Sequence, residues 1–168
     1  MFKYAGLRTN DCVNGTGICV SFWTQGCPFH CEGCHNPETW DPEGGMPYTK
    51  EVEERIISAI DANNIKRNFS ILGGEPFSEY SILLVLHLIG KVRKKFPNIK
   101  IYIWTGFLYE QLITDEVAAA ILENADFLID GRYISAQRDL NLKLRGSANQ
   151  RVIDLKQTRA AGKVITVD

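Results

Sequence analysis

Three cysteines are the residues of this sequence best suited to do chemistry. Cys27, Cys31 and Cys34 lie within eight residues, in the pattern C-x3-C-x2-C. Thiolates this close along the chain can wrap around one compact metal centre, and soft sulfur ligands favour zinc or an iron–sulfur cluster. The sequence therefore predicts a metal centre held by these three cysteines.

Three kinds of metal centre are compatible with three cysteines. A structural zinc site is normally closed by four ligands, and the fourth would have to be His30 or His35, inside the same short loop. A simple electron-carrying cluster usually has four cysteines. A four-iron cluster with three cysteines instead leaves one iron open to a substrate or cofactor. We expect this third arrangement, with the other two as alternatives.

Short apolar runs alternate with longer amphipathic ones along the chain, and these elements must position the cysteines. The pattern predicts helices at 49–63, from 78 or 81 to 96, and at 114–124, with Thr49 and Thr114 as caps. It predicts strands at 18–23, 69–72, 99–104, 126–130, 151–155 and 164–167. We therefore expect an α/β fold: one domain over 1–168, built as a partial, open (β/α) barrel of about six mostly parallel strands.

The helix that ends at 96 has a clear apolar stripe. The residues expected to face the core are Ile82, Leu86, Ile89, Val92 and Phe96. Pro97 follows directly and ends the helix.

Chemically suggestive segments follow each of the first four predicted strands. The cysteine segment follows the first strand, and residues 73–76, 104–106 and 130–132 follow the next three. In parallel α/β folds, ligands bind at the carboxyl ends of strands, so we expect one shared site there. Gly73 and Gly74 would let the backbone approach a ligand, although the same pair could form an ordinary turn.

The overall composition excludes some functions. The chain has 168 residues, and its 19 basic and 20 acidic side chains nearly cancel, so no positive field favours nucleic acid as a partner. No stretch reaches the roughly 18 apolar residues of a membrane span, and the first ten residues do not resemble a signal peptide. We expect a cytoplasmic protein without a membrane partner. In that compartment thiols stay reduced, which favours metal binding over disulfides.

Taken together, the motifs resemble the radical S-adenosylmethionine (SAM) superfamily. The resemblance rests on C-x3-C-x2-C after the first strand and on Gly-Gly-Glu-Pro at 73–76. Residues 34–41, Cys-His-Asn-Pro-Glu-Thr-Trp-Asp, are similar to the segment after the cluster in glycyl-radical-enzyme activases. Residues 11–17, 104–106, 130–132 and 145–150 narrow the resemblance to the activases of anaerobic ribonucleoside-triphosphate reductases. It covers nearly the whole chain.

The resemblance implies a [4Fe–4S] cluster on Cys27, Cys31 and Cys34, with SAM bound to the open iron. Reduced flavodoxin or ferredoxin would supply an electron, and SAM would be cleaved to methionine and a 5′-deoxyadenosyl radical. That radical would take a hydrogen atom from a glycine of the reductase large subunit. Because the cofactor carries this chemistry, no side chain is expected to act as acid, base or nucleophile. Activation of another enzyme, such as a formate lyase, is one alternative, and a non-catalytic zinc-stabilised binding module is another.

The resemblance also implies a set of cofactor-binding residues. Glu75 would pair with the ammonium group of SAM, and Asp130 and Arg132 would lie near SAM or a monovalent cation. Gly33 stands where many members carry an aromatic residue that touches the adenine, so only a backbone contact is expected there. His35 could equally be a packed loop histidine, and Asp130 with Arg132 a solvated pair. The full implied set is Gly33, Cys34, His35, Gly73, Gly74, Glu75, Thr105, Asp130 and Arg132.

Other residues have simpler interpretations. Cys19, in an apolar strand, is expected to be a small buried hydrophobe, and Cys12 is also not expected to be a ligand. Trp23 and Trp104 are expected in the core, as aromatic residues of strands. The polar segment 133–150 is a candidate contact surface for the partner protein, or else a solvated loop, and its basic residues are Arg138, Lys143 and Arg145.

Overall fold

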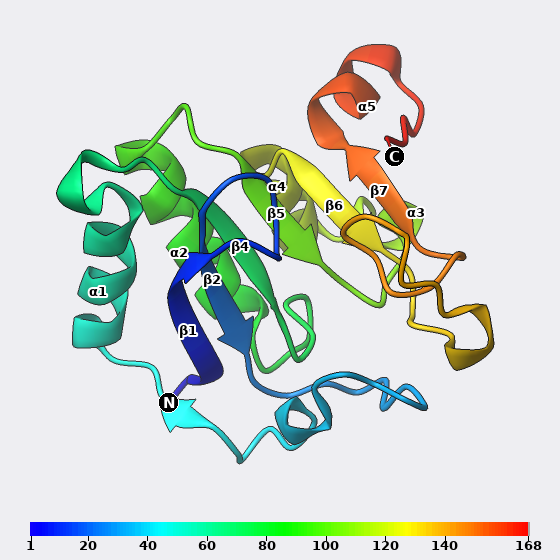
Figure 1. The fold of residues 1–168 in the computed structure, drawn as a ribbon, viewed down its shortest axis with the longest axis horizontal. Coiled ribbons are helices and arrows are strands. Elements are labelled where there is room, and N and C mark those ends of the chain that lie inside the picture. Colours follow the sequence, from blue (N-terminus) through cyan, green and yellow to red (C-terminus); the bar gives the residue numbers. More distant parts are fainter. Residues whose placement is uncertain (168) are drawn as a thin grey trace.

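The structure is a computed structural model that describes residues 1–167. Its centre is a seven-stranded sheet in the order β3-β1-β2-β4-β5-β6-β7 (Figure 1). The strands are β1 (Lys3–Asp11), β2 (Cys19–Thr24), β3 (Met46–Pro47), β4 (Asn68–Gly73), β5 (Ile101–Trp104), β6 (Phe127–Asp130) and β7 (Arg151–Asp154). The α-helices are α1 (Lys50–Ile60), α2 (Ile82–Lys95), α3 (Tyr109–Leu112), α4 (Glu116–Asn124) and α5 (Leu155–Ala161). Short 3-10 turns form at Pro37–Thr39, Ala62–Asn64 and Ser135–Gln137.

The middle of the sheet is parallel and its flanks are antiparallel. Strands β2, β4, β5 and β6 are parallel neighbours, whereas β1 is antiparallel to β2 and β3, and β7 is antiparallel to β6. The predicted α/β class is confirmed, but the expectation of mostly parallel strands is wrong at both flanks. A parallel connection needs a crossover of about a dozen residues, usually helical. The link 12–18 is too short for one, and the link 131–150 contains only a 3-10 turn.

The sheet is open, since β3 and β7 stand at opposite ends of the strand order. This agrees with the expectation of an open structure, while the barrel itself is not established by the strand order. Strand β1 is not foreseen from the sequence because most of its side chains are only partly buried and show no apolar alternation.

The end of the chain also differs from the prediction. A strand at 164–167 is wrong, because Thr166 forms only an isolated bridge to Ile153. Helix α5 lies between β7 and this bridge. The helix is capped by Asp154, whose carboxylate accepts the Gln157 N–H at 2.8 Å. Asp115, rather than Thr114, caps α4 in the same way.

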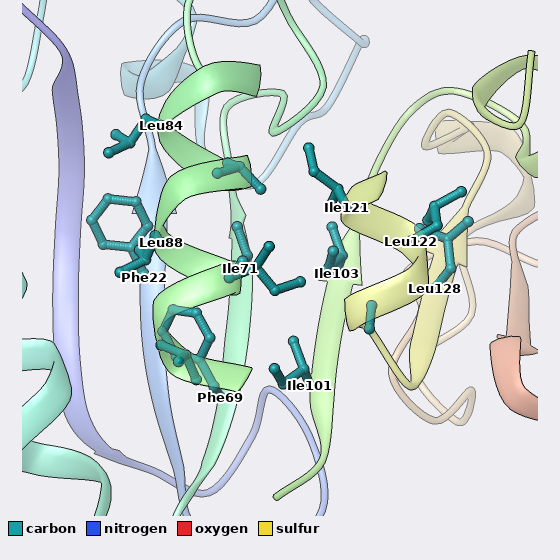
Figure 2. Close-up of a cluster of buried hydrophobic side chains, with 14 of the residues drawn as sticks. Phe22, Phe69, Ile71, Leu84, Leu88, Ile101, Ile103, Ile121, Leu122 and Leu128 are labelled. Atoms are coloured by element: carbon teal, nitrogen blue, oxygen red, sulfur yellow. The ribbon is translucent and has the colours of Figure 1, made fainter. Parts of the chain in front are cut away.

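The larger core lies between the sheet and the helices α1, α2 and α4. In Figure 2, Leu84 and Leu88 of α2 lie beside Phe22 and Ile71 of the sheet. Helix α2 also packs against α4, so its buried arc is wider than one stripe. The predicted stripe is therefore only partly right: Ile89 and Val92 are buried, but the half-buried residues at the margin are Ile82, Leu86 and Phe96. Within residues 1–167, no helix is long and apolar enough to cross a bilayer.

A smaller cluster covers the opposite face of the sheet. Side chains alternate along β5, so Ile101 and Ile103 face the helices while Tyr102 joins this second cluster. Tyr102 stacks on Phe127 with ring centroids 5.0 Å apart. Trp104 is half-buried here rather than in the main core, which corrects its predicted place. This second face is where the site is built.

Candidate functional site

The cysteine segment forms a closed loop at the carboxyl end of β2 (Figure 1). Gly26 donates its N–H to the Thr39 carbonyl at 2.8 Å, and Cys27 donates to the Trp40 carbonyl at 3.1 Å. The chain therefore leaves and returns at one place. Inside the loop, the His30 ring stacks on Trp40 with centroids 4.7 Å apart. These contacts close the loop on itself.

The three cysteines of the motif line one cavity of about 400 Å³. Cys34 donates its N–H to the Cys31 carbonyl at 3.1 Å, and its sulfur accepts the Asn36 N–H at 3.4 Å. Burial raises the pKa of Cys27 and of Cys31, because a thiolate loses hydration there. A bound metal ion reverses this preference by stabilising the thiolate.

Within residues 1–167, no group of three His, Cys, Asp or Glu side chains is arranged to hold one metal ion. The remaining cysteines lie elsewhere, and neither lines the cavity: Cys12 is exposed, and Cys19 is fully buried, which confirms its prediction as a small buried hydrophobe.

Gly73 and Gly74 lie where β4 meets the base of the cysteine loop. A Cβ at Gly74 would be 2.5 Å from the Gly26 carbonyl oxygen, and one at Gly73 would be 2.8 Å from the backbone of β2. Gly73 also has a φ of +106°, which disfavours other residues. Both glycines line the cavity. The space where their side chains would stand is occupied by the backbone of β2 and of Gly26.

The Glu75 carboxylate is buried and joins the ends of two strands. It accepts hydrogen bonds from the Thr105 hydroxyl at 2.8 Å, the Gly106 N–H at 2.8 Å and the Phe77 N–H at 3.0 Å. Burial raises the pKa of Glu75 to about 7, although these three donors lower it. A carboxylate offers about four acceptor positions, so the three internal donors leave about one for a ligand.

Most of the predicted cofactor residues meet in the same cavity. Strands β2, β4, β5 and β6 are parallel neighbours, so the segments that follow them reach one edge of the sheet. Gly33 and Asp130 do not line the cavity: Gly33 backs onto Tyr133 and Ser135 instead. The predicted residues on its lining are Cys27, Cys31, Cys34, His35, Gly73, Gly74, Glu75, Thr105 and Arg132.

Asp130 is a buried structural carboxylate. It accepts hydrogen bonds from the Arg151 guanidinium, one of them at 2.9 Å, and from the Tyr109 N–H at 2.8 Å. Arg151 also pairs with Glu110 at 2.8 Å. The alternative of a solvated pair between Asp130 and Arg132 is thus wrong. Because a guanidinium already neutralises Asp130, the geometry also disfavours the monovalent cation expected there.

Arg132 lies on the cavity wall and is held by the cysteine loop. Its guanidinium carbon is 4.3 Å from the ring centroid of Phe29, a cation–π contact. Phe29 in turn packs on Phe107, and it leaves no room for a side chain at Gly106. The role of Phe29 was not foreseen, although an aromatic residue between two of the cysteines was a visible signal.

The link 131–150 closes one side of the cavity. Trp104 donates its indole N–H to the Leu144 carbonyl at 2.7 Å, and the Tyr133 ring lies 5.4 Å from that of His35 and close to Gly146. The sequence analysis expected residues 104–106 at the shared site and 133–150 on a contact surface, but it did not assign Tyr133, Leu144 or Gly146 to the cavity wall. The only signal was Trp104, which alternates with Ile103 and so had to face away from the helices.

Comparisons with known proteins agree with this geometry. Residues 13–153 match the 4Fe-4S single cluster domain family. The chain is 38% identical over 141 residues to the anaerobic ribonucleoside-triphosphate reductase-activating protein of Vibrio cholerae, covering 83% of this chain and 90% of that protein. It is 34% identical over 147 residues to the same-named protein of Escherichia coli, covering 87% and 94%. The corresponding protein of Haemophilus influenzae is 33% identical over 149 residues, covering 88% and 95%. On these matches, the chain belongs to the family of anaerobic ribonucleoside-triphosphate reductase-activating proteins, with a 4Fe-4S single cluster domain.

Proposed function

We propose that this protein is a radical SAM activase that generates a glycyl radical on an anaerobic ribonucleoside-triphosphate reductase. One observation carries the proposal: three cysteine thiols share a cavity with the carboxyl ends of β4 and β5 and with Arg132, beyond the end of β6. A metal centre in this cavity would lie beside both a negative and a positive side chain, Glu75 and Arg132. That arrangement suits a zwitterionic cofactor.

Cys27, Cys31 and Cys34 would hold a [4Fe–4S] cluster and leave one iron open. Bound there, the cluster would pass one electron from an external donor to SAM, and this chemistry would supply methionine and the 5′-deoxyadenosyl radical needed to take a hydrogen atom from a glycine. Three thiols from one short loop fit such a cluster better than a structural zinc ion, because a structural zinc site is normally closed by four protein ligands. This favours the enzyme over a zinc-stabilised binding module.

The chain's own residues would bind and orient SAM. Arg132, fixed by Phe29, offers a positive charge suited to the SAM carboxylate. Glu75 offers its remaining acceptor position to the ammonium group of SAM. The hydrogen bond from the Thr105 hydroxyl holds the Glu75 carboxylate in place. His35 and Gly74 line the same cavity and complete the cradle. Gly33 and Asp130 would act only indirectly, by shaping the loops that carry these groups.

The partner is inferred from the relatives, whose names specify activation of the anaerobic reductase. The reductase large subunit would be the protein substrate, and reduced flavodoxin or ferredoxin the electron donor. A protein substrate can itself cover an open cavity and exclude water from the radical. The link 131–150, with four basic residues and one acidic residue, is a suitable contact surface.

The test is anaerobic reconstitution with iron and sulfide, followed by reduction with SAM and a purified reductase large subunit. We expect 5′-deoxyadenosine in solution and a carbon-centred radical signal on the reductase by electron paramagnetic resonance. A chain that binds one equivalent of zinc and cleaves no SAM contradicts the proposal. A larger radical yield on a formate lyase than on the reductase would assign the activity to that other partner.

A further inference from the structure

The last residues of the link 131–150 hold the backbone at its beginning. The Gln150 side-chain amide donates to the Gly131 carbonyl at 2.9 Å, and the Asn149 side-chain amide donates to the Arg132 carbonyl at 2.8 Å. Two successive side chains therefore bind two successive carbonyl groups. Because peptide units are planar, these hydrogen bonds restrain the peptide planes on both sides of Arg132.

Both amide groups are themselves held in one orientation. Ser147 is fully buried, and its hydroxyl donates to the Asn149 side-chain oxygen at 2.7 Å. The Gln150 side-chain oxygen accepts the backbone N–H of Gly146 at 2.9 Å and that of Ser147 at 3.2 Å. Each amide is thus bound through its oxygen and through its nitrogen, so neither group can turn over without losing a hydrogen bond.

The side chain of Arg132 is held at its other end. Its guanidinium carbon lies 4.3 Å from the ring centroid of Phe29. Gly131, directly before it, has a φ of +95° and donates its N–H to the Phe107 carbonyl at 3.0 Å, so the turn after β6 is fixed as well. Arg132 is exposed, and an exposed arginine without such contacts samples many rotamers. Holding it in one place before a ligand arrives lowers the entropy cost of binding.

A second arginine of the cavity has a different place in this network. Arg145 lines the cavity together with Arg132, and its guanidinium donates to the Gln150 backbone carbonyl at 3.0 Å. Arg132 instead contacts Phe29, which stands between two cysteines of the motif. The arginine that contacts the cysteine loop is the one placed to meet a ligand of a metal centre held by that loop.

We propose that Asn149 and Gln150 are positioning residues that hold Arg132 in place for the SAM carboxylate. They act through the backbone carbonyls of Gly131 and Arg132, and not through contact with SAM. This inference rests on the proposed function and adds the residues that set the affinity of the site for the carboxylate end of SAM.

The test is a double-mutant cycle measured as SAM binding. Anaerobically reconstituted protein is titrated with SAM without a reductant, so that no SAM is cleaved. Asn149→Ala and Gln150→Ala should each weaken SAM binding about tenfold, because Arg132 must then be ordered as the ligand binds. In the Arg132→Ala background, Asn149→Ala should weaken SAM binding no further, because both residues serve one interaction.

A ligand without the carboxylate is the second probe. Decarboxylated SAM keeps the sulfonium, the adenosine and the ammonium group, so its affinity should be the same for Asn149→Ala as for the unaltered protein. The matched control is Gln137→Ala, which should bind SAM normally. Gln137 is exposed on the same link and, within residues 1–167, joins the hydrogen bonds only through its backbone. Asn149 is also exposed, so its truncation leaves the core intact even if Gln150→Ala does not fold.

Three results overturn the inference. They are an additive loss of SAM affinity in the double variant, an equal loss for SAM and decarboxylated SAM, and full SAM affinity in Arg132→Ala. The first two would mean that Asn149 only stabilises the link, and the third that the carboxylate binds elsewhere. A reconstituted protein that binds no SAM contradicts the proposed function as well, whereas SAM binding that is insensitive to Asn149 and Gln150 contradicts this inference alone.

Discussion

Glu75, just beyond β4, accepts a hydrogen bond of 2.8 Å from the hydroxyl of Thr105, just beyond β5. The same carboxylate accepts the Gly106 N–H, so one buried acid joins the two strand ends that line the cysteine cavity. The sequence motif suggests a ligand-binding acid. The geometry adds a second role, in which Glu75 positions the segment after β5.

The first prediction concerns the pH dependence that Glu75 gives to stability. Burial raises the pKa of Glu75 from 4.5 to about 7. A raised pKa favours the protonated form in the folded state, so this contribution is full below about pH 4.5 and is lost as pH rises through 7. Relative to Glu75→Gln, the unaltered protein should lose roughly 3 kcal/mol of unfolding free energy across this range. Urea unfolding of both proteins between pH 4.5 and 8 measures the difference, and a difference independent of pH contradicts it.

The second prediction concerns the close approach of backbones at Gly74. Gly74→Ala places a Cβ 2.5 Å from the Gly26 carbonyl oxygen, so the base of the cysteine loop must shift. We expect a loss of about 1–3 kcal/mol of unfolding free energy, the usual cost of overpacking. The control is Gly90→Ala in α2, where a Cβ meets nothing within 4 Å. That variant should gain about 0.5–1 kcal/mol from helix propensity. Equal effects at both glycines, measured by urea unfolding, contradict the prediction.

The third prediction ranks the two carboxylates that pair with Arg151 by their contribution to stability. Asp130 is fully buried and bound to Arg151, so Asp130→Ala should lower the unfolding free energy by roughly 3 kcal/mol. Glu110 also pairs with Arg151 but is half-exposed, so Glu110→Gln should cost less than about 1 kcal/mol. Thermal or urea unfolding ranks the two. A Glu110 variant as unstable as the Asp130 variant argues against this assignment.

The fourth prediction concerns the metal ligands. Replacing Cys27, Cys31 or Cys34 by Ala should abolish the broad visible absorbance of the reconstituted protein and most of its iron and sulfide. Cys12→Ala and Cys19→Ala are the matched controls, because neither cysteine lines the cavity. Both should keep the cluster, with Cys19→Ala somewhat less stable because Cys19 is fully buried. A full iron content in any of the first three variants contradicts the ligand assignment.

Much of the site could be predicted because its chemistry is local in the sequence. The spacing of the three cysteines and the segments after the parallel strands mark the cavity without any knowledge of distant contacts. Strand β1 and helix α5 could not be predicted in this way, because their side chains show no strong periodicity and their pairing decides their form. The prediction of which α2 residues face the core is partly wrong for a similar reason, since α4 covers a second side of that helix.

The sequence by itself determined the cluster of three cysteines, the α/β class and the edge of the sheet where their cavity forms, because residue types and the alternation of apolar and amphipathic runs can be read along the chain. Only the tertiary structure decided which partner holds each acid: Asp130 is neutralised by Arg151, 21 residues away, and Glu75 is held by Thr105, 30 residues away. It also decided that Val13, Trp104 and Leu144, from three separate segments, line the cysteine cavity together. Such contacts join residues far apart in the chain, and local sequence patterns carry no information about which distant partner each will meet.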